Sequence, residues 1–427
     1  MIIADLHLHS RYSRACSKDL TIPNLEKHGR IKGLGLMGTS DFTHPLWLKE
    51  LKQHLVEDGS GILRTKTGFP FILQTEVSNL YPQDGKGRRV HNIILAKSFE
   101  VVEQINEHLS KKGKLASDGR PMFGRYACCD MVEDLKRIDK DIEIIPAHIW
   151  TPWFSVFGSE SGFDSLQDCF RDQTKHIHAL ETGLSSDPAM NWRLSMLDKY
   201  TLVSNSDSHS YWPWRIGREA NAFDLEDKEL SYDRIMNILK TREKFLFTIE
   251  VDPSYGKYHF DGHRVCNVCM SPKESIKNKD ICPKCGKRLT IGVLHRVEEL
   301  ADRPEGFALK GAVPFKSMIP LSEIISTNMG VGIATQKTKK IVSSLMERFE
   351  SEFNVLLNAS FEELKKTVDE KLAELIIKNR EGKIYVKPGY DGEYGIPVFD
   401  DEGIKQAKID SNNTFSAKHK QMSLGDF

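Results

Sequence analysis

Seven short apolar runs, each with the composition of a β-strand, begin or end on an ionisable residue. Segments with helical periodicity, such as residues 98–112 and 131–141, separate most of them. Strands that alternate with helices indicate a parallel sheet, and ionisable residues at many carboxyl ends of strands indicate a (β/α) barrel with its site at that rim. We therefore expect an α/β fold, a (β/α) barrel of seven strands. The runs span residues 1–9, 33–41, 69–76, 90–96, 142–148, 176–181 and 200–209.

The residues at these run ends have the chemistry of metal ligands. Residues i and i+2 of a strand point to the same face, so the imidazoles of His7 and His9 should converge on one point. A mixture of imidazole and carboxylate suits zinc, manganese or iron better than calcium. The predicted ligands are His7, His9, Glu76, His91, His148, Asp207 and His209.

Seven ligands exceed the needs of a single ion. Two divalent ions (Zn, Mn, Mg or Fe) that share a bridging carboxylate fit better, although a single zinc with spare histidines is the plain alternative. Glu76 is the natural bridge, and the predicted catalytic residues are Glu76, Asp207 and His209. Because a two-metal centre neutralises both the attacking and the leaving oxygen, this ligand set predicts a metal-dependent phosphoesterase.

Composition excludes little about the partner of the chain. The 427 residues carry 60 basic and 60 acidic side chains, so the net charge is zero. Because binding a nucleic acid needs only a local basic patch, a net charge of zero neither indicates nor excludes such a partner. No apolar run reaches the ~18 residues of a membrane span, and the N-terminus lacks the basic start and apolar stretch of a signal peptide. We expect a cytoplasmic protein without a membrane partner.

Four of the eight cysteines form the pattern CxxC-x12-CxxC. Two pairs of soft thiolates close a tetrahedral zinc site, and this clustering favours a metal over disulfides. We expect one structural zinc bound by Cys266, Cys269, Cys282 and Cys285. Such a site has no open position and should stabilise its module rather than react.

The motifs DLHLH, SD at 40–41, QTE at 74–76, VH at 90–91, AH at 147–148 and SDSH at 206–209 occur in the order found in the polymerase-and-histidinol-phosphatase (PHP) superfamily. This resemblance covers about residues 1–250. It implies a distorted seven-stranded (β/α) barrel whose multinuclear metal centre hydrolyses phosphoesters. Ala15 and Phe42 stand where many members have a further ligand, so we favour two ions; Asp19 or His44 could rebuild a third site, and Asp41 is expected beside the ligands rather than among them.

Longer stretches resemble the endonuclease Q family within that superfamily, and this resemblance covers nearly the whole chain. The stretches lie at residues 147–165, 181–192, 204–221 and 255–266. The resemblance implies a DNA-repair nuclease that hydrolyses the phosphodiester on the 5′ side of uracil, hypoxanthine, xanthine or an abasic site. Damaged DNA is then the expected partner.

Aromatic and basic residues follow the predicted ligands and should line the same rim. Aromatic rings stack on unpaired bases, and a nuclease that inspects one base must hold it in a pocket. Arginines position phosphates, although a single arginine is usually a solvated or ion-paired residue, and some of the aromatics could instead cap the barrel core. The predicted DNA and base contacts are Arg11, Arg88, Arg89, Trp150, Trp153, Ser185, Asn191, Trp212 and Arg215.

These patterns divide the chain into four predicted parts. We expect a PHP-like barrel at 1–252, a zinc module at 253–300, a helical DNA-binding region at 301–400 and a flexible tail at 401–427. In the tail, Gln421, Leu424 and Phe427 fit Q-x-x-L-x-x-F. This pattern resembles the peptide by which repair proteins bind a sliding clamp, bacterial or archaeal (PCNA-like), which makes such a clamp an expected partner.

Two rival functions stay open on the sequence. A PHP phosphatase of a small phosphorylated metabolite would use the same metal chemistry, but would need neither a zinc module nor a clamp-like tail. A non-catalytic DNA-binding adaptor with a relict barrel would not need the nearly complete ligand set.

Overall fold

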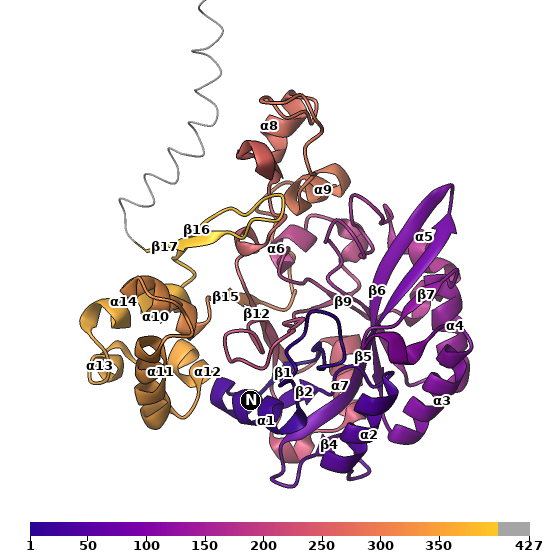
Figure 1. Cartoon of the computed structure of the whole chain (residues 1–427), viewed down its shortest axis with the longest axis horizontal. Helices are drawn as coiled ribbons and strands as arrows, with labels where there is room; N and C mark the ends of the chain where they lie inside the picture. The colour runs from indigo at the N-terminus through magenta and orange to yellow at the C-terminus, as the bar shows by residue number, and fades with distance from the viewer. Residues whose placement is uncertain (400–427) are drawn as a thin grey trace, which may run out of the picture.

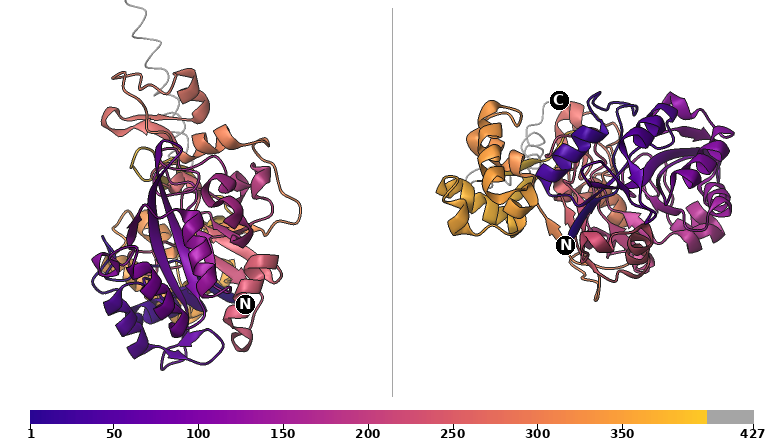
Figure 2. Two further views of the ribbon diagram at one scale, coloured as in Figure 1. Left: turned by 90° about the vertical axis from the view of Figure 1, so that its right-hand side faces the viewer. Right: turned by 90° about the horizontal axis from the view of Figure 1, so that it is seen from below.

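The computed structural model describes residues 1–399 of the chain. The N-terminal part, drawn indigo to magenta in Figure 1, is a mixed α/β unit around a central sheet. A small module that contains α8 projects from one end of this unit, and the helices α10 to α14 form a group beside it (Figures 1 and 2). The predicted domain boundaries are compatible with these groups and stay predictions.

A mixed sheet of eleven strands forms the centre of the described residues. The strand order is β15-β12-β11-β1-β2-β5-β4-β3, with β6 and β7 also paired to β5, and β8 paired to β6. Parallel pairs join β1 to β2 and β2 to β5. The strands are β1 (Ile2–Asp5), β2 (Leu36–Gly38), β3 (Val56–Glu57), β4 (Leu63–Arg64), β5 (Pro70–Gln83), β6 (Lys86–Ala96), β7 (Met122–Gly124), β8 (Glu143–Pro146), β11 (Ala220–Phe223), β12 (Phe245–Glu250) and β15 (Phe315–Ser317).

All seven predicted runs form strands, the last two as the separate parallel pair β9 (Ala179–Glu181) and β10 (Thr201–Val203). The expectation of a parallel sheet is only partly right, because β6 runs antiparallel to both β5 and β8. The cause is the two-residue turn Asp84–Gly85, whose φ angles are 53° and 72°. A two-residue turn with positive φ at both positions joins antiparallel strands, and Asp-Gly is a strong signal for it.

Contacts between the two sheets bring the strand ends together. Leu8, just past β1, forms a parallel bridge with Ser208, beyond β10. The Ile149 N–H donates to the carbonyl oxygen of Glu181 at 3.1 Å, which joins the end of β8 to the end of β9. The predicted ligands that follow β1, β8 and β10 are therefore neighbours, while closure of seven strands into a barrel stays a prediction.

Amphipathic helices cover the sheet, and a side chain caps the first turn of most of them. Ser98 accepts a hydrogen bond from the Val101 N–H at 3.2 Å, which starts the helix predicted at 98–112 as α3. No helix in the described residues is both long and apolar enough to cross a membrane. The helices of this unit are α1 (Ile22–Lys32), α2 (Pro45–His54), α3 (Phe99–Ser110), α4 (Cys128–Ile138), α5 (Leu166–Phe170), α6 (Pro188–Asn191) and α7 (Tyr232–Thr241), with the 3₁₀ turns η1 (Leu115–Ser117), η2 (Arg171–His176), η3 (Ser195–Leu197), η4 (Asp227–Glu229) and η5 (Pro253–Tyr255).

The projecting module is built on a short antiparallel hairpin. Val268, Met270, Cys282 and Leu289 form its small buried core. Because the module has few apolar side chains, a bound metal would supply much of its stability. Its elements are β13 (Asp261–His263), η6 (Arg264–Cys266), β14 (Val268–Met270), α8 (Pro272–Lys277) and α9 (Val293–Leu300).

The C-terminal helices dock on α1 through a buried ion pair. Nζ of Lys32 lies 2.7 Å from Oε1 of Glu352, and both side chains are 1% exposed. The Leu321 N–H donates to the same carboxylate at 3.1 Å. Gly33, with φ of 93°, lets α1 end there, since a Cβ would lie 2.8 Å from Oγ of Ser351. The elements are α10 (Leu321–Met329), α11 (Gln336–Phe349), α12 (Glu352–Leu357), α13 (Phe361–Leu364), α14 (Glu370–Arg380), β16 (Tyr385–Lys387) and β17 (Ile396–Val398).

Removing one partner of this pair should strongly destabilise the protein. Glu352→Gln leaves the buried ammonium of Lys32 without a counter-charge, and we expect the free energy of unfolding to fall by about 3–5 kcal/mol. The matched control is Glu370→Gln, which breaks the partly exposed pair with Lys365 and should cost at most about 1 kcal/mol. Urea denaturation measures both, and equal costs for the two variants would contradict the buried pair as the main docking contact.

Candidate metal centre

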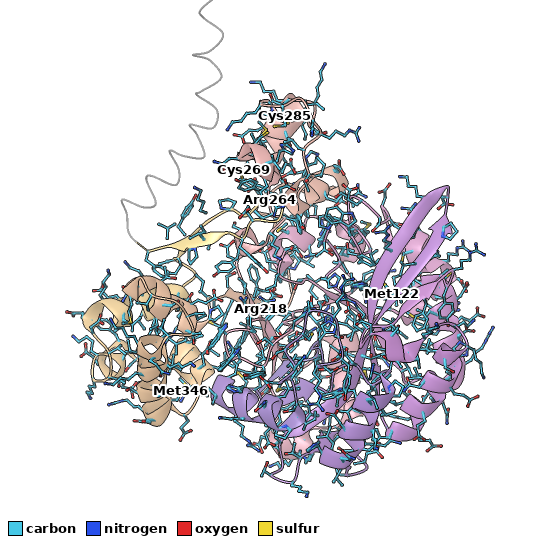
Figure 3. All side chains as sticks on the ribbon, in the orientation of Figure 1. Met122, Arg218, Arg264, Cys269, Cys285 and Met346 are labelled. Atoms are coloured by element: carbon cyan, nitrogen blue, oxygen red, sulfur yellow. The ribbon has the colours of Figure 1, made fainter. Side chains whose placement is uncertain are left out.

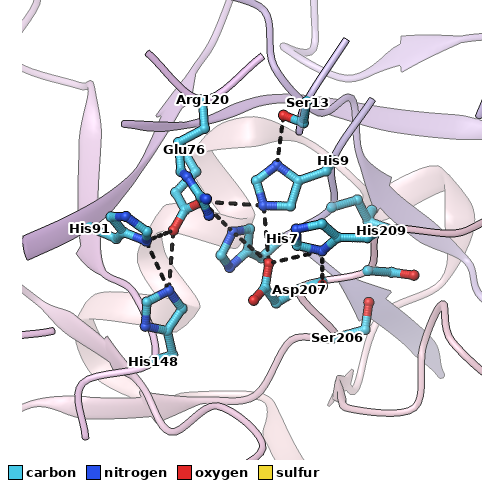
Figure 4. A network of polar contacts seen from close by, with 12 residues as sticks. His7, His9, Ser13, Glu76, His91, Arg120, His148, Ser206, Asp207 and His209 are labelled. Carbon is cyan, nitrogen blue, oxygen red and sulfur yellow. Dashed lines mark hydrogen bonds and ion pairs between the residues drawn. The ribbon is translucent and has the colours of Figure 1, made fainter. Parts of the chain in front are cut away.

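Histidines and carboxylates from five strands meet in one buried cluster (Figure 4). His7 and His9 follow β1, Glu76 lies within β5, and His91 lies within β6. His148 follows β8 and Asp207 follows β10. Six of the seven predicted ligands therefore reach one place, and they divide into two groups that share Glu76.

The first group contains His7, His9, Glu76 and Asp207. Nε2 of His9 lies 3.0 Å from Oδ1 of Asp207 and 3.2 Å from Oε2 of Glu76. Nε2 of His7 lies 3.6 Å from the same oxygen of Glu76 and 3.7 Å from Oδ1 of Asp207. Two imidazole nitrogens and two carboxylate oxygens thus face one point.

The second group contains Glu76, His91 and His148. Oε1 of Glu76 lies 2.7 Å from Nδ1 of His91 and 3.2 Å from Nε2 of His148. The two histidine nitrogens are 3.2 Å apart. Since Oε2 serves the first group and Oε1 the second, Glu76 has the geometry of a carboxylate that bridges two ions.

A buried nitrogen without a hydrogen-bond partner also indicates that the cluster binds a metal. Nε2 of His7 is buried and has no hydrogen-bond partner among the described residues. A buried polar nitrogen without a partner is costly, and a metal ion would satisfy it. Nitrogen and oxygen donors in these proportions suit zinc, manganese or iron.

The electrostatic field of the cluster favours positive charge. Burial opposes protonation of His7, but the carboxylates of Glu181 and Glu76 outweigh burial and hold the pKa of His7 well above its usual range. Burial raises the pKa of Glu76, but His91, Arg120 and His7 outweigh it and hold that pKa well below its usual range. Carboxylates that hold protons on buried imidazoles are also the groups that would hold divalent cations in their place.

Two further carboxylates contact Nδ1 of His7 and Nδ1 of His9, while Nε2 of each ring faces the other predicted ligands. Nδ1 of His7 lies 3.0 Å from Oε1 of Glu181, which also accepts from Nδ2 of Asn205 at 2.9 Å. Nδ1 of His9 lies 3.2 Å from Oδ1 of Asp41, so Asp41 contacts a predicted ligand. Such partners set the ring orientation and tautomer of a ligand histidine. Glu181 ends one of the seven runs, so its position at a strand end was a signal for this role.

Three other predicted residues lie outside both groups. His209 approaches Asp207, with Nδ1 3.0 Å from its carbonyl oxygen and 3.8 Å from Oδ1. His44 is buried against the ring of Tyr12, with centroids 4.3 Å apart. Asp19 is exposed. The structure therefore brings neither candidate for a third site into the cluster.

Arg120, on the loop between η1 and β7, was not predicted. Its Nη1 donates to Oε2 of Glu76 at 3.0 Å. The loop reads SDGRP in the sequence, and nothing in that pattern signals a site.

A cleft of about 600 Å³ opens onto the cluster from Asp207, His148 and His209. The cleft reaches the segment before the projecting module and the β16–β17 region. In Figure 3, Arg218 lies between the module that contains Cys285 and the helices that contain Met346. Other lining residues are Ser185, Arg215, Arg218, Lys257, Tyr258 and Tyr394.

Comparisons with known proteins identify a family model and two relatives that this chain resembles. Residues 320–383 match the family model described as the MJ0043 C-terminal domain. The uncharacterized protein MJ0043 of Methanocaldococcus jannaschii is 36% identical over 249 residues, which are 58% of this chain and 31% of that protein. The uncharacterized protein YqxK of Bacillus subtilis is 30% identical over 414 residues, which are 92% of this chain and 98% of that protein.

Two solved structures resemble the chain over nearly its full length. The lesion-specific endonuclease PfuEndoQ of Pyrococcus furiosus superposes with a TM-score of 0.84 at 32% identity, over 97% of this chain and 98% of that one. Endonuclease Q in complex with a 27-mer duplex that has an abasic lesion at the active site superposes with a TM-score of 0.83 at 32% identity, over 94% and 97%. The chain belongs to the endonuclease Q family. It is therefore an enzyme, and the predicted family is confirmed.

In this member of the endonuclease Q family, Trp150 and Asn191, which we predicted to contact a base, both lie in the core. Trp150 is fully buried, and its Nε1 donates to Oδ1 of Asn191 at 2.8 Å. Nδ2 of Asn191 donates to the Asp187 carbonyl oxygen at 2.8 Å and to Oγ of Ser186 at 3.2 Å. Neither side chain keeps a polar group for a base, which corrects the expectation for this pair. Ser185, in contrast, lines the cleft.

The other two predicted aromatics, Trp153 and Trp212, keep part of their surface exposed. Trp153 is 38% exposed and packs edge-on against Tyr258, which lines the cleft. Trp212 stacks on Trp214 with centroids 4.9 Å apart, and Nζ of Lys339 from α11 lies 5.3 Å from its ring centroid. The segment after His209 is therefore tied to the C-terminal helices.

Of the four predicted arginines, one lines the cleft and three have partners within the protein. Arg215 lines the cleft. Arg11 is paired with Glu50 at 2.6 Å. Arg88 donates to the Gly162 carbonyl oxygen and packs over the ring of Phe163, and Arg89 lies over the ring of Phe154. Arg11, Arg88 and Arg89 have partners within the protein, so a DNA contact for them stays a prediction.

The structure groups His263, rather than Cys269, with three of the four predicted zinc ligands. His263, Cys266, Cys282 and Cys285 each offer a ligand atom within 4.8 Å of the others. The alternation of β14 explains the change, because Val268 and Met270 face the small core and Cys269 between them faces the opposite way. The spacing H-x2-C at 263–266 is the sequence signal for the alternative ligand.

Metal content should separate the two ligand sets. His263→Ala removes one of four donors, so we expect the module to lose its zinc, whereas Cys269→Ser, the matched control in the same hairpin, should keep it. Elemental analysis of the purified variants after dialysis against a mild chelator measures this. Loss of zinc in Cys269→Ser with retention in His263→Ala would restore the four-cysteine site.

Proposed function

We propose that this endonuclease Q family member is a lesion-specific DNA endonuclease that hydrolyses the phosphodiester on the 5′ side of a deaminated base (uracil, hypoxanthine or xanthine) or an abasic site. The observation that carries the proposal is the pair of metal-ligand groups joined by Glu76 at the floor of a cleft. The family relationship supports DNA as the substrate, since a solved relative holds a duplex with an abasic lesion at its active site.

The residues of the centre have distinct tasks in this proposal. Two divalent ions, when bound, would supply Lewis acidity and a more acidic water at neutral pH. Glu76 holds the two sites at a fixed spacing, and His7, His9, His91 and His148 complete them. Among the carboxylates of the cluster in the described residues, Asp207 is the one open to solvent, with 29% of its side chain exposed. This exposure supports a role for Asp207 in accepting a proton from the attacking water.

The projecting module offers a surface for the duplex that flanks the lesion. In residues 261–290, no acidic side chain is exposed, whereas seven basic side chains are. Fixed positive charge of this kind binds the phosphate backbone without reading sequence. The basic side chains are Arg264, Lys273, Lys277, Lys279, Lys284, Lys287 and Arg288.

The C-terminal parts of the chain have supporting tasks. The helices α10 to α14, docked on α1, are proposed to hold DNA beside the cleft, and Lys339 lies against Trp212 at that junction. The clamp-binding residues Gln421, Leu424 and Phe427 lie outside the described residues. Binding to a sliding clamp rests on the sequence pattern alone and stays part of the proposal.

Cleavage of defined duplexes tests the function directly. With Mn²⁺ or Mg²⁺, we expect a nick on the 5′ side of a single uracil, hypoxanthine or abasic site, and no cut in the undamaged duplex. Asp207→Ala should lower the rate by more than the roughly 100-fold that losing an outer partner of a metal ligand costs. Denaturing gel electrophoresis of end-labelled strands measures the position and rate of the nick.

The control is Asp172→Ala, which removes an aspartate that is 75% exposed on η2 and should leave the rate unchanged. Turnover of small phosphomonoesters without nicking would favour a metabolite phosphatase. Binding of the lesion duplex without cleavage would favour a non-catalytic adaptor. Full activity of Asp207→Ala would contradict the proposed centre.

A further inference from the structure

We propose that Arg120 is a catalytic residue that binds the scissile phosphate and stabilises the charge that develops on it during hydrolysis. The proposal rests on the proposed function only in that this centre cleaves a phosphodiester. It is carried by the contact of the guanidinium with Glu76, its unused donors and its partial exposure.

The loop that carries Arg120 is built against the metal-ligand segments. The Gly119 N–H donates to the Tyr12 carbonyl oxygen at 3.0 Å, and the Thr43 hydroxyl donates to the Gly119 carbonyl oxygen at 3.3 Å. The Arg120 N–H donates to Oδ1 of Asp118 at 3.1 Å. A Cβ at Gly119 would lie 2.3 Å from Oδ2 of Asp41, so only glycine lets the backbone approach this closely. The residue before Arg120 is thus fixed on the carboxylate that orients His9.

The guanidinium has more donors than the protein uses. Among the described residues, its one hydrogen bond is from Nη1 to Oε2 of Glu76. An arginine offers five N–H donors in a planar fork, so most of the donors of Arg120 face no protein acceptor. A planar fork with unused donors matches two oxygens of a phosphate, and such bidentate pairs are strong because the acceptor is charged.

The guanidinium of Arg120 is one of the few parts of the cluster that solvent reaches, and its exposure is similar to that of Asp207, which lines the cleft. The side chains of His7, His9 and Glu76 are fully buried, and that of His91 is 6% exposed. The side chain of Arg120 is 26% exposed, close to the 29% of Asp207. A phosphate that reaches the cluster over Asp207 therefore meets a cation that already contacts the bridging carboxylate.

The chemical step assigns Arg120 an electrostatic role only. In hydrolysis, a water oxygen forms a bond to phosphorus and the bond from phosphorus to the leaving oxygen breaks. The water gives up one proton, and the leaving oxygen takes one up. Arg120 exchanges no proton and forms no covalent bond. It stabilises the negative charge on the non-bridging oxygens, which grows at the transition state.

Two variants test the role. Arg120→Gln removes the charge, and Arg120→Lys keeps the charge but loses the planar fork. We expect Arg120→Gln to lower kcat on the abasic duplex about 100- to 1000-fold, with a smaller loss for Arg120→Lys. The metal content of the centre around Glu76 should equal that of the wild type in both.

A binding measurement gives a readout that does not depend on turnover. Titration of inorganic phosphate into the metal-loaded protein should show a Kd that is about 10- to 100-fold weaker in Arg120→Gln, the loss expected for a charged hydrogen bond. The matched control is Arg64→Lys in β4, whose side chain is 25% exposed and pairs with Asp227. It should change neither the Kd nor kcat.

The outcomes separate this proposal from the proposed function. If the wild type nicks no lesion duplex, a chromogenic phosphodiester replaces DNA, and the phosphate titration still decides the role of Arg120. Unchanged phosphate binding and unchanged kcat in Arg120→Gln would overturn it. Loss of metal together with activity would also overturn it, because Arg120 would then only hold Glu76 in place.

Discussion

The two oxygens of a single carboxylate are the contact on which the rest of the centre depends. Oε2 of Glu76 faces His7 and His9, and Oε1 faces His91 and His148. Glu76 lies in the middle of β5, which pairs in parallel with β2 near its start and antiparallel with β6 along most of its length. The mixed sheet thus has a function, because the hairpin of β5 and β6 brings His91 back beside Glu76, which a parallel crossover would not do at this spacing.

A buried carboxylate is stable only when positively charged or hydrogen-bonding groups surround it. The histidines and Arg120 surround Glu76, and Glu181 and Asp41 balance the histidines from behind. The polar side chains of the cluster are held by other polar side chains, so the cost of burying them is offset only when all are present. Asp207, which lines the cleft, and Arg120 are the most exposed of these side chains, and we therefore assign the substrate to this part of the cluster.

The sequence predicts the parts of this centre that obey strand periodicity. All seven runs form strands, and six of the seven ligands converge, because strand ends and i, i+2 spacing set their direction. Arg120 could not be found in this way, since a loop arginine follows no period. Trp150 shows the opposite limit: His148 lies at the rim, but Trp150, two residues further along the chain, packs into the core. His263 does not follow from the CxxC pattern, because only the direction of the β14 side chains shows that Cys269 faces away from Val268 and Met270.

Anomalous diffraction from crystals soaked in manganese tests the shared carboxylate most directly. We expect two anomalous peaks, one among His7, His9 and Asp207 and one beside His91 and His148, with an oxygen of Glu76 bound to each. A single peak, or two peaks of which neither touches Glu76, would contradict it.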